Sequence, residues 1–122
     1  MIHGVGTDIL AMHRLQGVAQ DEVFLTRVYS EAERDEAERQ ADKERYFCSR
    51  FSAKEAVFKS LGIPPDSVRL NEIEICKGEH GKPIVNLLGK VKNLAEARDV
   101  KEVHLSLSWE EDYVVAFAVA CG

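Results

Sequence analysis

The sequence predicts an α+β fold in which an antiparallel sheet packs against one long central helix. An apolar stripe at helical spacing runs between a suitable N-cap, Asp42, and a suitable terminating glycine, Gly62, which Pro64 and Pro65 follow. Two alternating apolar runs near the end of the chain are separated by only three residues, which is typical of a β-hairpin. We expect residues 1–122 to form a single domain.

The composition limits the classes of function. The 122 residues carry a formal net charge of −5 at pH 7, and the sequence pI is about 5.4. This balance argues against a dedicated binder of nucleic acid or of anionic membranes. Three cysteines and four histidines show neither disulfide nor zinc spacing. No signal-peptide pattern or membrane span is visible, so we expect a cytoplasmic protein with no membrane partner.

The first expected element is a strand over residues 2–10. One face of this strand would carry His3, Val5, Thr7 and Ile9, and the other Gly4, Gly6 and Asp8. The second face is nearly bare, so a ligand or another backbone can come close to it. A dinucleotide-binding fingerprint is rejected, because Ile9 replaces its third glycine and no βα unit of suitable length follows. Asp8 is either a strand-end turn former or a ligand-binding carboxylate.

Short helical segments are expected next, over residues 12–18, 21–28 and 30–40. Asp21 and Ser30 are suitable N-caps, and Ser30 with Glu33 has the spacing of a capping box. The charged run over residues 31–45 interleaves both signs, as on a solvated helical face.

Arg14 and Arg27 lie in these segments among apolar neighbours. Solvated surface charges are the more common fate of arginine. The alternative is a basic patch that binds an acidic protein partner.

The long helix carries three informative charges. Lys54 falls inside the apolar stripe, whereas Glu55 and Lys59 lie along its border, one turn apart. Glu55 and Lys59 are either a surface pair worth about 0.3–0.5 kcal/mol, or a carboxylate and an ammonium that point into a shared cleft. In the second case they could hold a divalent metal and a phosphate.

The second half of the chain predicts more strands. Residues 70–76 and 84–87 are expected strands, and helical spacing follows over residues 88–98. The glycine-rich connection between these strands is either a plain hairpin loop or a phosphate site that uses backbone amides and Lys82. The final hairpin pairs residues 103–109 with residues 113–120. Its second strand is apolar on both faces, which predicts a buried position in the middle of the sheet and a homo-oligomer.

Four segments together resemble one family. They are Ile2-x-Gly-x-Gly-x-Asp8-Ile9, Arg50-Phe-x-Ala-Lys54-Glu55-Ala-x-Phe-Lys59-x-Leu-Gly62, Gly81-Lys82-Pro83 and His104-Leu-Ser-Leu-Ser108. Their order and spacing across the chain resemble the holo-[acyl-carrier-protein] synthases, the short type of 4′-phosphopantetheinyl transferase. The resemblance implies a transferase of fatty acid biosynthesis that moves phosphopantetheine from coenzyme A to a serine of apo acyl carrier protein. It also implies a homotrimer with active sites between subunits.

The resemblance assigns roles to individual residues. Asp8, Glu55 and Lys59 would be catalytic, with the two carboxylates as Mg²⁺ ligands. The residues that would bind coenzyme A are Arg50, Lys59, Gly81, Lys82, Pro83 and Ser106. Acyl carrier protein would dock through basic residues, with Arg14 at the matching position and Arg27 as a second candidate.

One residue departs from the family pattern. Many members carry histidine at the position of Trp109, where it is a candidate for deprotonating the attacking hydroxyl. An indole has no basic lone pair, so Trp109 cannot do this. The base is then left open between a metal-bound water and Asp8 or Glu55 acting through water. Two rival functions are a coenzyme A-dependent acyltransferase, which needs no paired carboxylates, and a non-catalytic interaction module.

Overall fold

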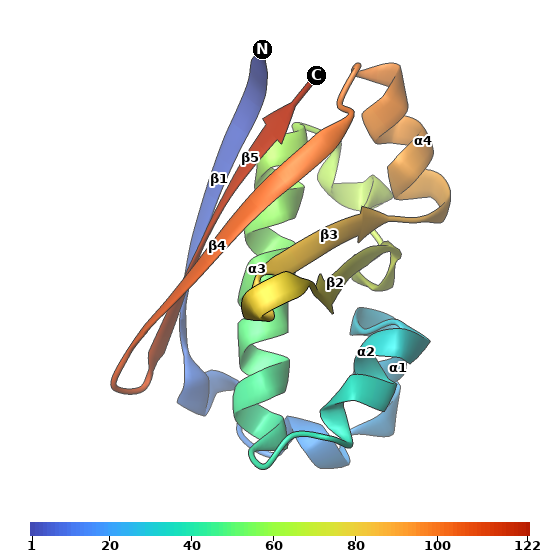
Figure 1. Ribbon diagram of the computed structural model, residues 1–122. Helices are drawn as coiled ribbons and strands as arrows, with labels where there is room; N and C mark the ends of the chain where they lie inside the picture. The colour runs from blue at the N-terminus through green and yellow to red at the C-terminus, as the bar shows by residue number, and fades with distance from the viewer.

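Helix α3 (Lys43–Leu61) runs through the middle of the computed structural model, which describes residues 1–122 (Figure 1). The strands are β1 (Ile2–Ala11), β2 (Ile73–Lys77), β3 (Pro83–Leu87), β4 (Glu102–Glu110) and β5 (Tyr113–Cys121). The other α-helices are α1 (Glu22–Val28), α2 (Glu31–Ala37) and α4 (Gly89–Ala97). These elements confirm the predicted α+β class with a long central helix.

The strands form two antiparallel sheets rather than the one sheet that was predicted. The larger sheet has the order β1-β5-β4, and β2 pairs with β3 in a separate hairpin. The expected strand over residues 70–76 begins only at Ile73, because Leu70–Glu72 forms a 3₁₀ turn. Glu72 in this turn accepts hydrogen bonds from the backbone amides of Leu88 and Val91, and so ties the turn to the start of α4.

Strand β5 lies in the middle of the larger sheet, as predicted, but only one of its faces is buried. The buried face packs on α3 and consists of Val114, Ala116, Ala118 and Ala120. The opposite face stays exposed because no other layer of this chain covers it; Phe117 is 42% exposed and Val115 is 37% exposed. Ile9 of β1, on the outer side of the same sheet, is 66% exposed.

The predicted helix caps are confirmed. The side chains of Asp21, Ser30 and Asp42 each accept a hydrogen bond from a backbone amide in the first turn of their helix, and Ser30 belongs to a complete capping box. Gly62 ends α3 in the left-handed region, at φ 66°. The helix expected over residues 12–18 is instead a pair of 3₁₀ turns, separated at Gly17, whose φ is 83°.

Two groups of buried side chains surround α3. The larger group fills the space between α3, the inner face of β5, the β2–β3 hairpin and α4. The smaller group is rich in aromatic rings and joins α1 and α2 to the first half of α3. No helix has the length and the apolar character that a membrane crossing requires.

Candidate active site

Helix α3 lies directly on the glycine face of β1. The contacts are Ser52 with Asp8, Ala56 with Gly6, and Ser60 with Gly4. These contacts repeat every four residues along α3 and every two residues along β1. The two spacings match because four residues of an α-helix rise about 6 Å and two residues of a strand rise about 6.6 Å. A Cβ atom on Gly6 would collide with the carbonyl oxygen of Ala56. Of the two alternatives for this bare face, the structure therefore shows the approach of another backbone.

This contact brings together the three residues expected to be catalytic. The Nζ atom of Lys59 lies 3.7 Å from Oδ1 of Asp8 and donates a hydrogen bond of 3.0 Å to the carbonyl oxygen of Thr7. The hydroxyl of Ser52 donates a 2.8 Å hydrogen bond to Oδ2 of Asp8 and fixes that carboxylate. Lys59 therefore pairs with Asp8, and the surface pair of Glu55 with Lys59 is not formed.

The two carboxylates of this cluster repel each other. Burial raises the pKa of Glu55, the nearby charge of Asp8 raises it further, and Lys59 opposes both effects. A cation between the carboxylates would relieve this repulsion. The structure contains no group of three or more histidine, cysteine, aspartate or glutamate side chains that could hold a metal. Two carboxylates nevertheless suit Mg²⁺, because this ion usually keeps waters and substrate phosphates as its other ligands.

The residues expected to bind coenzyme A meet in a different place. A cavity of about 650 Å³ lies beside β4 and is lined by five of them: Arg50, Gly81, Lys82, Pro83 and Ser106. Lys59, the sixth, is not among the lining residues. The same cavity is lined by Lys77, His104 and Trp109, to which no individual binding role was assigned. Lys77 begins the glycine-rich connection, and His104 and Trp109 lie on the strand of Ser106, which the resemblance already implied as a lining of the coenzyme A site.

Two arginines beside this cavity stack on aromatic rings. The guanidinium of Arg50 lies 4.5 Å from the centre of the Tyr46 ring, and its Nη1 donates a 3.1 Å hydrogen bond to the hydroxyl of Ser49. The Nε of Arg50 is buried and has no hydrogen-bond partner. The guanidinium of Arg45 lies 4.7 Å from the centre of the Trp109 ring. A cavity lined by Arg50 and two lysines, Lys77 and Lys82, suits an anionic ligand.

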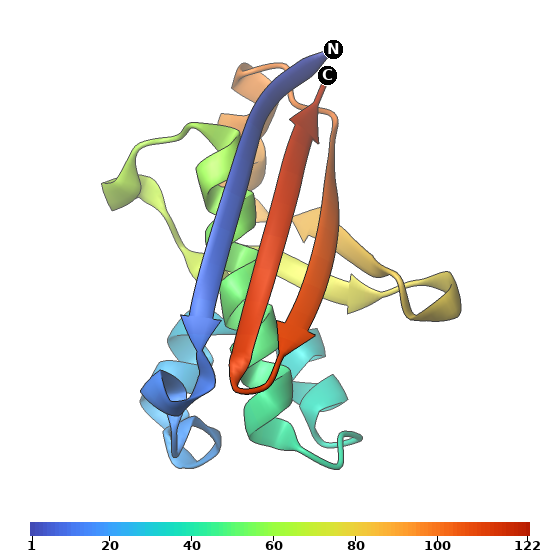
Figure 2. The same cartoon turned by 90° about the vertical axis from the view of Figure 1, so that its left-hand side faces the viewer.

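The structure does not bring these two groups of residues together. Strands β1 and β4 are the opposite edges of the larger sheet, with β5 between them (Figure 2). The carboxylate cluster lies where β1 meets α3. The cavity is lined mainly by β4 and by the connection from β2 to β3, which projects beyond the β4 edge, and it extends onto Phe117 and Val119 of β5 (Figure 2). Each edge of the sheet therefore carries one part of the expected site.

The two arginines expected to bind a partner are both exposed. Arg14 lies in the 3₁₀ turn Met12–Leu15, immediately after β1, and Arg27 lies in the last turn of α1. Neither makes an ion pair. Val23, one turn before Arg27 on α1, is 67% exposed, so apolar and basic groups adjoin on this surface.

Comparisons with known proteins agree with the geometry. Residues 4–118 match the model of the 4′-phosphopantetheinyl transferase superfamily. The holo-[acyl-carrier-protein] synthase of Caldanaerobacter subterraneus is 37% identical over 119 residues, which cover 97% of this chain and 94% of that protein. The crystal structure of the Neisseria meningitidis synthase superposes with a TM-score of 0.89 at 32% identity, with complete coverage of both chains. A Bacillus anthracis synthase in complex with coenzyme A (3′,5′-ADP) gives a TM-score of 0.78 at 29% identity, covering 98% and 96% of the two chains.

Proposed function

Because this chain belongs to the 4′-phosphopantetheinyl transferase superfamily, we propose that it is a cytoplasmic holo-[acyl-carrier-protein] synthase of fatty acid biosynthesis. It transfers 4′-phosphopantetheine from coenzyme A to a serine of apo acyl carrier protein. The serine oxygen forms a bond to the β-phosphorus, the bond from this phosphorus to the bridging oxygen breaks, and adenosine 3′,5′-bisphosphate leaves. The observation that carries the proposal is the cluster of Asp8, Glu55 and Lys59 at the contact of β1 with α3.

The carboxylate cluster supplies the polar groups for this reaction. Asp8, held by Ser52, and Glu55 would bind Mg²⁺. When bound, Mg²⁺ neutralises charge on the pyrophosphate oxygens and makes the phosphorus more electrophilic. The ammonium of Lys59, whose side chain is 51% exposed, is available to a phosphate oxygen and stabilises charge on the leaving group.

The proton of the serine hydroxyl needs an acceptor other than Trp109. The indole of Trp109 stacks on Arg45 and carries no basic nitrogen. Burial and the charge of Asp8 raise the pKa of Glu55 in the metal-free protein, but a cation bound by the two carboxylates would lower it again. We propose that the proton leaves through a water molecule held at the Asp8–Glu55 cluster.

Mass spectrometry tests this function directly. The protein is incubated with apo acyl carrier protein, coenzyme A and Mg²⁺, and the mass of the carrier protein is measured. We expect a gain of one phosphopantetheine group, and no gain when EDTA removes the metal. A gain of an acyl group from an acyl-coenzyme A would indicate the rival acyltransferase, and an unchanged mass would indicate an interaction module.

We propose further that the active site is completed by a second copy of the chain in a homotrimer. Two observations support this: the parts of the site lie at opposite edges of one sheet, and the outer face of that sheet is apolar and exposed. In a closed ring, each subunit presents one edge to the next, so the β1 edge of one copy can meet the β4 edge of its neighbour.

Mixing two inactive variants checks this shared site. Glu55→Gln removes a metal ligand, and Lys82→Ala removes a phosphate contact. After the two proteins are unfolded and refolded together in equal amounts, about one quarter of the interfaces should combine both intact parts, because each interface draws its two sides independently. We expect about one quarter of wild-type activity, and light scattering should give the mass of three subunits. A monomer, or a mixture as inactive as its components, would contradict the proposal.

Reversing the charge of Arg14 should weaken the use of acyl carrier protein. The enzyme carries a net charge of −5, so an acidic partner requires a local basic surface. We expect Arg14→Glu to raise KM for the carrier protein at least about tenfold, with KM for coenzyme A nearly unchanged, and the effect should shrink in high salt. Equal changes in both constants would remove Arg14 from the docking surface. Arg98→Glu, another exposed arginine, serves as the control.

A further inference from the structure

The lysine immediately before Glu55 lies in the protein interior. The side chain of Lys54 is fully buried, although a charged side chain is rarely buried without a partner. This burial agrees with its position inside the apolar stripe of the helix. Its hydrogen-bond partners are Glu33, Leu70 and Ile73, none of which belongs to either part of the proposed active site.

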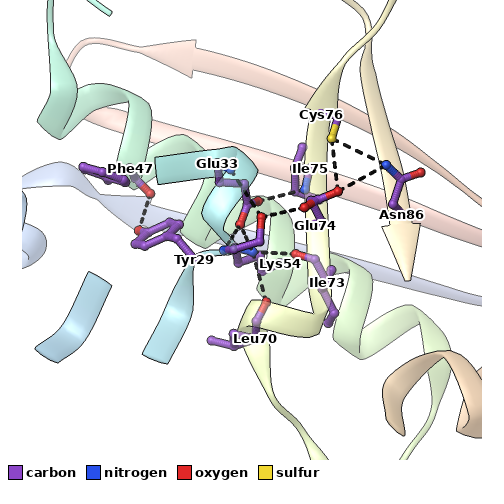
Figure 3. A network of polar contacts seen from close by, with 11 residues as sticks. Tyr29, Glu33, Phe47, Lys54, Leu70, Ile73, Glu74, Ile75, Cys76 and Asn86 are labelled. Carbon is purple, nitrogen blue, oxygen red and sulfur yellow. Dashed lines mark hydrogen bonds and ion pairs between the residues drawn. The ribbon is translucent and has the colours of Figure 1, made fainter. Parts of the chain in front are cut away.

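Lys54 uses all three of its donors in the interior (Figure 3). Its Nζ donates a 2.6 Å hydrogen bond to Oε1 of Glu33 on α2 and a 3.0 Å hydrogen bond to the carbonyl oxygen of Leu70. A third, shorter hydrogen bond goes to the carbonyl oxygen of Ile73 at the start of β2. Nζ also lies 5.5 Å from the centre of the Tyr29 ring. One ammonium therefore joins α3 to α2 and to β2.

Glu33 completes this connection from the other side. Its Oε2 accepts a 2.8 Å hydrogen bond from the backbone amide of Ile75, and its Oε1 accepts one of the same length from the amide of Ser30. The hydroxyl of Ser30 in turn donates a 2.7 Å hydrogen bond to Glu74. Every polar atom of the buried pair thus has partners, which is the condition under which a buried ion pair can be specific.

The position of Lys54 on α3 is what links it to the active site. A residue two positions from Ser52 and two from Ala56 lies about 160–200° from both around the helix axis. Lys54 therefore holds the side of α3 that is opposite to the contact with β1. The helix is fixed on one side by the glycines of β1 and on the other by hydrogen bonds to β2 and α2.

We infer that Lys54, together with Glu33, is a positioning residue that sets the rotation of α3 and so aims Glu55 at Asp8. This inference rests on the proposed function of the Asp8–Glu55 pair. A rotation of the helix by roughly 20° would move a carboxylate at its surface by about 2 Å, which is as large as a metal–oxygen distance. Misplacements of this size lower catalytic rates strongly, even when the substituted residue is remote from the reaction.

The test compares a buried pair with an exposed pair on the same helix. Lys54→Met alone would leave the Glu33 charge unpaired in the interior and destabilise the protein. The main variant is therefore Lys54→Met with Glu33→Gln, which is neutral and similar in volume. The new side-chain oxygen can still accept from one of the two backbone amides, of Ser30 or of Ile75, whereas the NH₂ group cannot accept from the other. The control is Lys43→Met with Glu38→Gln, which removes a surface pair of 2.9 Å between α3 and the end of α2. Thermal melts verify that both variants fold.

Metal binding is measured directly, with Mn²⁺ as the probe and electron paramagnetic resonance as the readout, in the presence of coenzyme A. We expect the buried-pair variant to bind Mn²⁺ roughly tenfold more weakly, since losing support around a metal ligand typically costs 10–100-fold. Its kcat should fall at least about tenfold, with KM for coenzyme A within about twofold of wild type. The control should match wild type in all three measurements.

Two results would overturn the inference. The first is a folded buried-pair variant that binds Mn²⁺ and turns over like wild type, which would make the pair purely structural. The second is an activity loss that equals the unfolded fraction, with unchanged kcat per folded molecule. A wild-type protein that neither binds Mn²⁺ nor modifies carrier protein would overturn the proposed function, and this inference with it. The wild-type sample alone distinguishes that failure from a failure of the inference.

Discussion

Replacing Glu55 with glutamine should lower the rate of phosphopantetheine transfer by about 10²-fold or more, as expected when several kcal/mol of transition-state charge stabilisation are lost. The substitution preserves the shape of the side chain and removes the charge that Mg²⁺ requires. Glu55 is only partly buried and accepts no hydrogen bond within the protein, so the fold should survive. The measurement is kcat at saturating coenzyme A and Mg²⁺, with circular dichroism as a check on folding.

Asp8→Asn should reduce transfer to a similar extent, because both carboxylates would act through one ion. The double variant should be little slower than either single variant, since the second substitution removes a ligand from a site that has already lost its metal. Glu44→Gln is the control, because it neutralises a carboxylate in the first turn of the same helix. Near-normal transfer by Glu55→Gln would exclude α3 as the catalytic element.

A single methyl group on Gly6 should damage both stability and activity. Its Cβ would collide with the carbonyl oxygen of Ala56, and neither backbone can yield without moving α3 away from β1. Overpacking of this kind costs about 2–3 kcal/mol, so the midpoint of urea unfolding should fall clearly. The remaining folded protein should also transfer at least about tenfold more slowly, because the same displacement separates Glu55 from Asp8.

Gly62→Ala separates this collision from the general cost of replacing a glycine. Gly62 has a positive φ of 66°, and the nearest atom to an added Cβ is 4.0 Å away, at the end of the Arg98 side chain. We expect a cost of about 1 kcal/mol from backbone strain and no loss of activity per folded molecule. A Gly6→Ala protein as stable and active as wild type would show that the contact of β1 with α3 is not what places the carboxylates.

The local features of the fold were predictable because they depend on neighbouring residues. The alternation in β1 correctly assigned Gly6 and Asp8 to one face, and the caps of α3 follow from side chains within one turn of its ends. Strand β5 was correctly placed in the middle of a sheet from its two apolar faces. The division into two sheets was not predicted, because it depends on where β3 and β4 pass each other without pairing.

The ion-pair partner of the buried Lys54 could not be predicted from the sequence. The sequence placed Lys54 inside the apolar stripe of α3, and the structure shows that this charge is buried and paired. The partner, Glu33, lies 21 residues earlier in a run whose interleaved charges were interpreted as a solvated face. That interpretation is wrong for Glu33, which is 1% exposed, because α2 packs against β2 at this point. The capping box identified the role of Glu33 at the helix end but gave no sign of its burial.

The resemblance supplied the candidate active-site residues, but not which of them lie apart within one chain. Lys82 lies just before β3, and Ser106 lies on β4. That they line one cavity can be inferred only when β3 and β4 are known to be neighbours. The separation of this cavity from the carboxylate cluster could not be predicted either, because it follows from the strand order β1-β5-β4. Strand order depends on contacts between distant segments, for which the sequence of one chain carries little local signal.

The order of strands in the larger sheet also affects how the protein is made. Its central strand, Tyr113–Cys121, is synthesised after both of its neighbours. Ile2–Ala11 therefore cannot pair in the sheet until a segment more than 100 residues later in the chain has been made. Sheets closed by such distant pairing form slowly, and their unpaired strands expose apolar side chains meanwhile. During synthesis Asp8 therefore gains its pairing partner in the sheet, Ala116, only after Tyr113–Cys121 has been made.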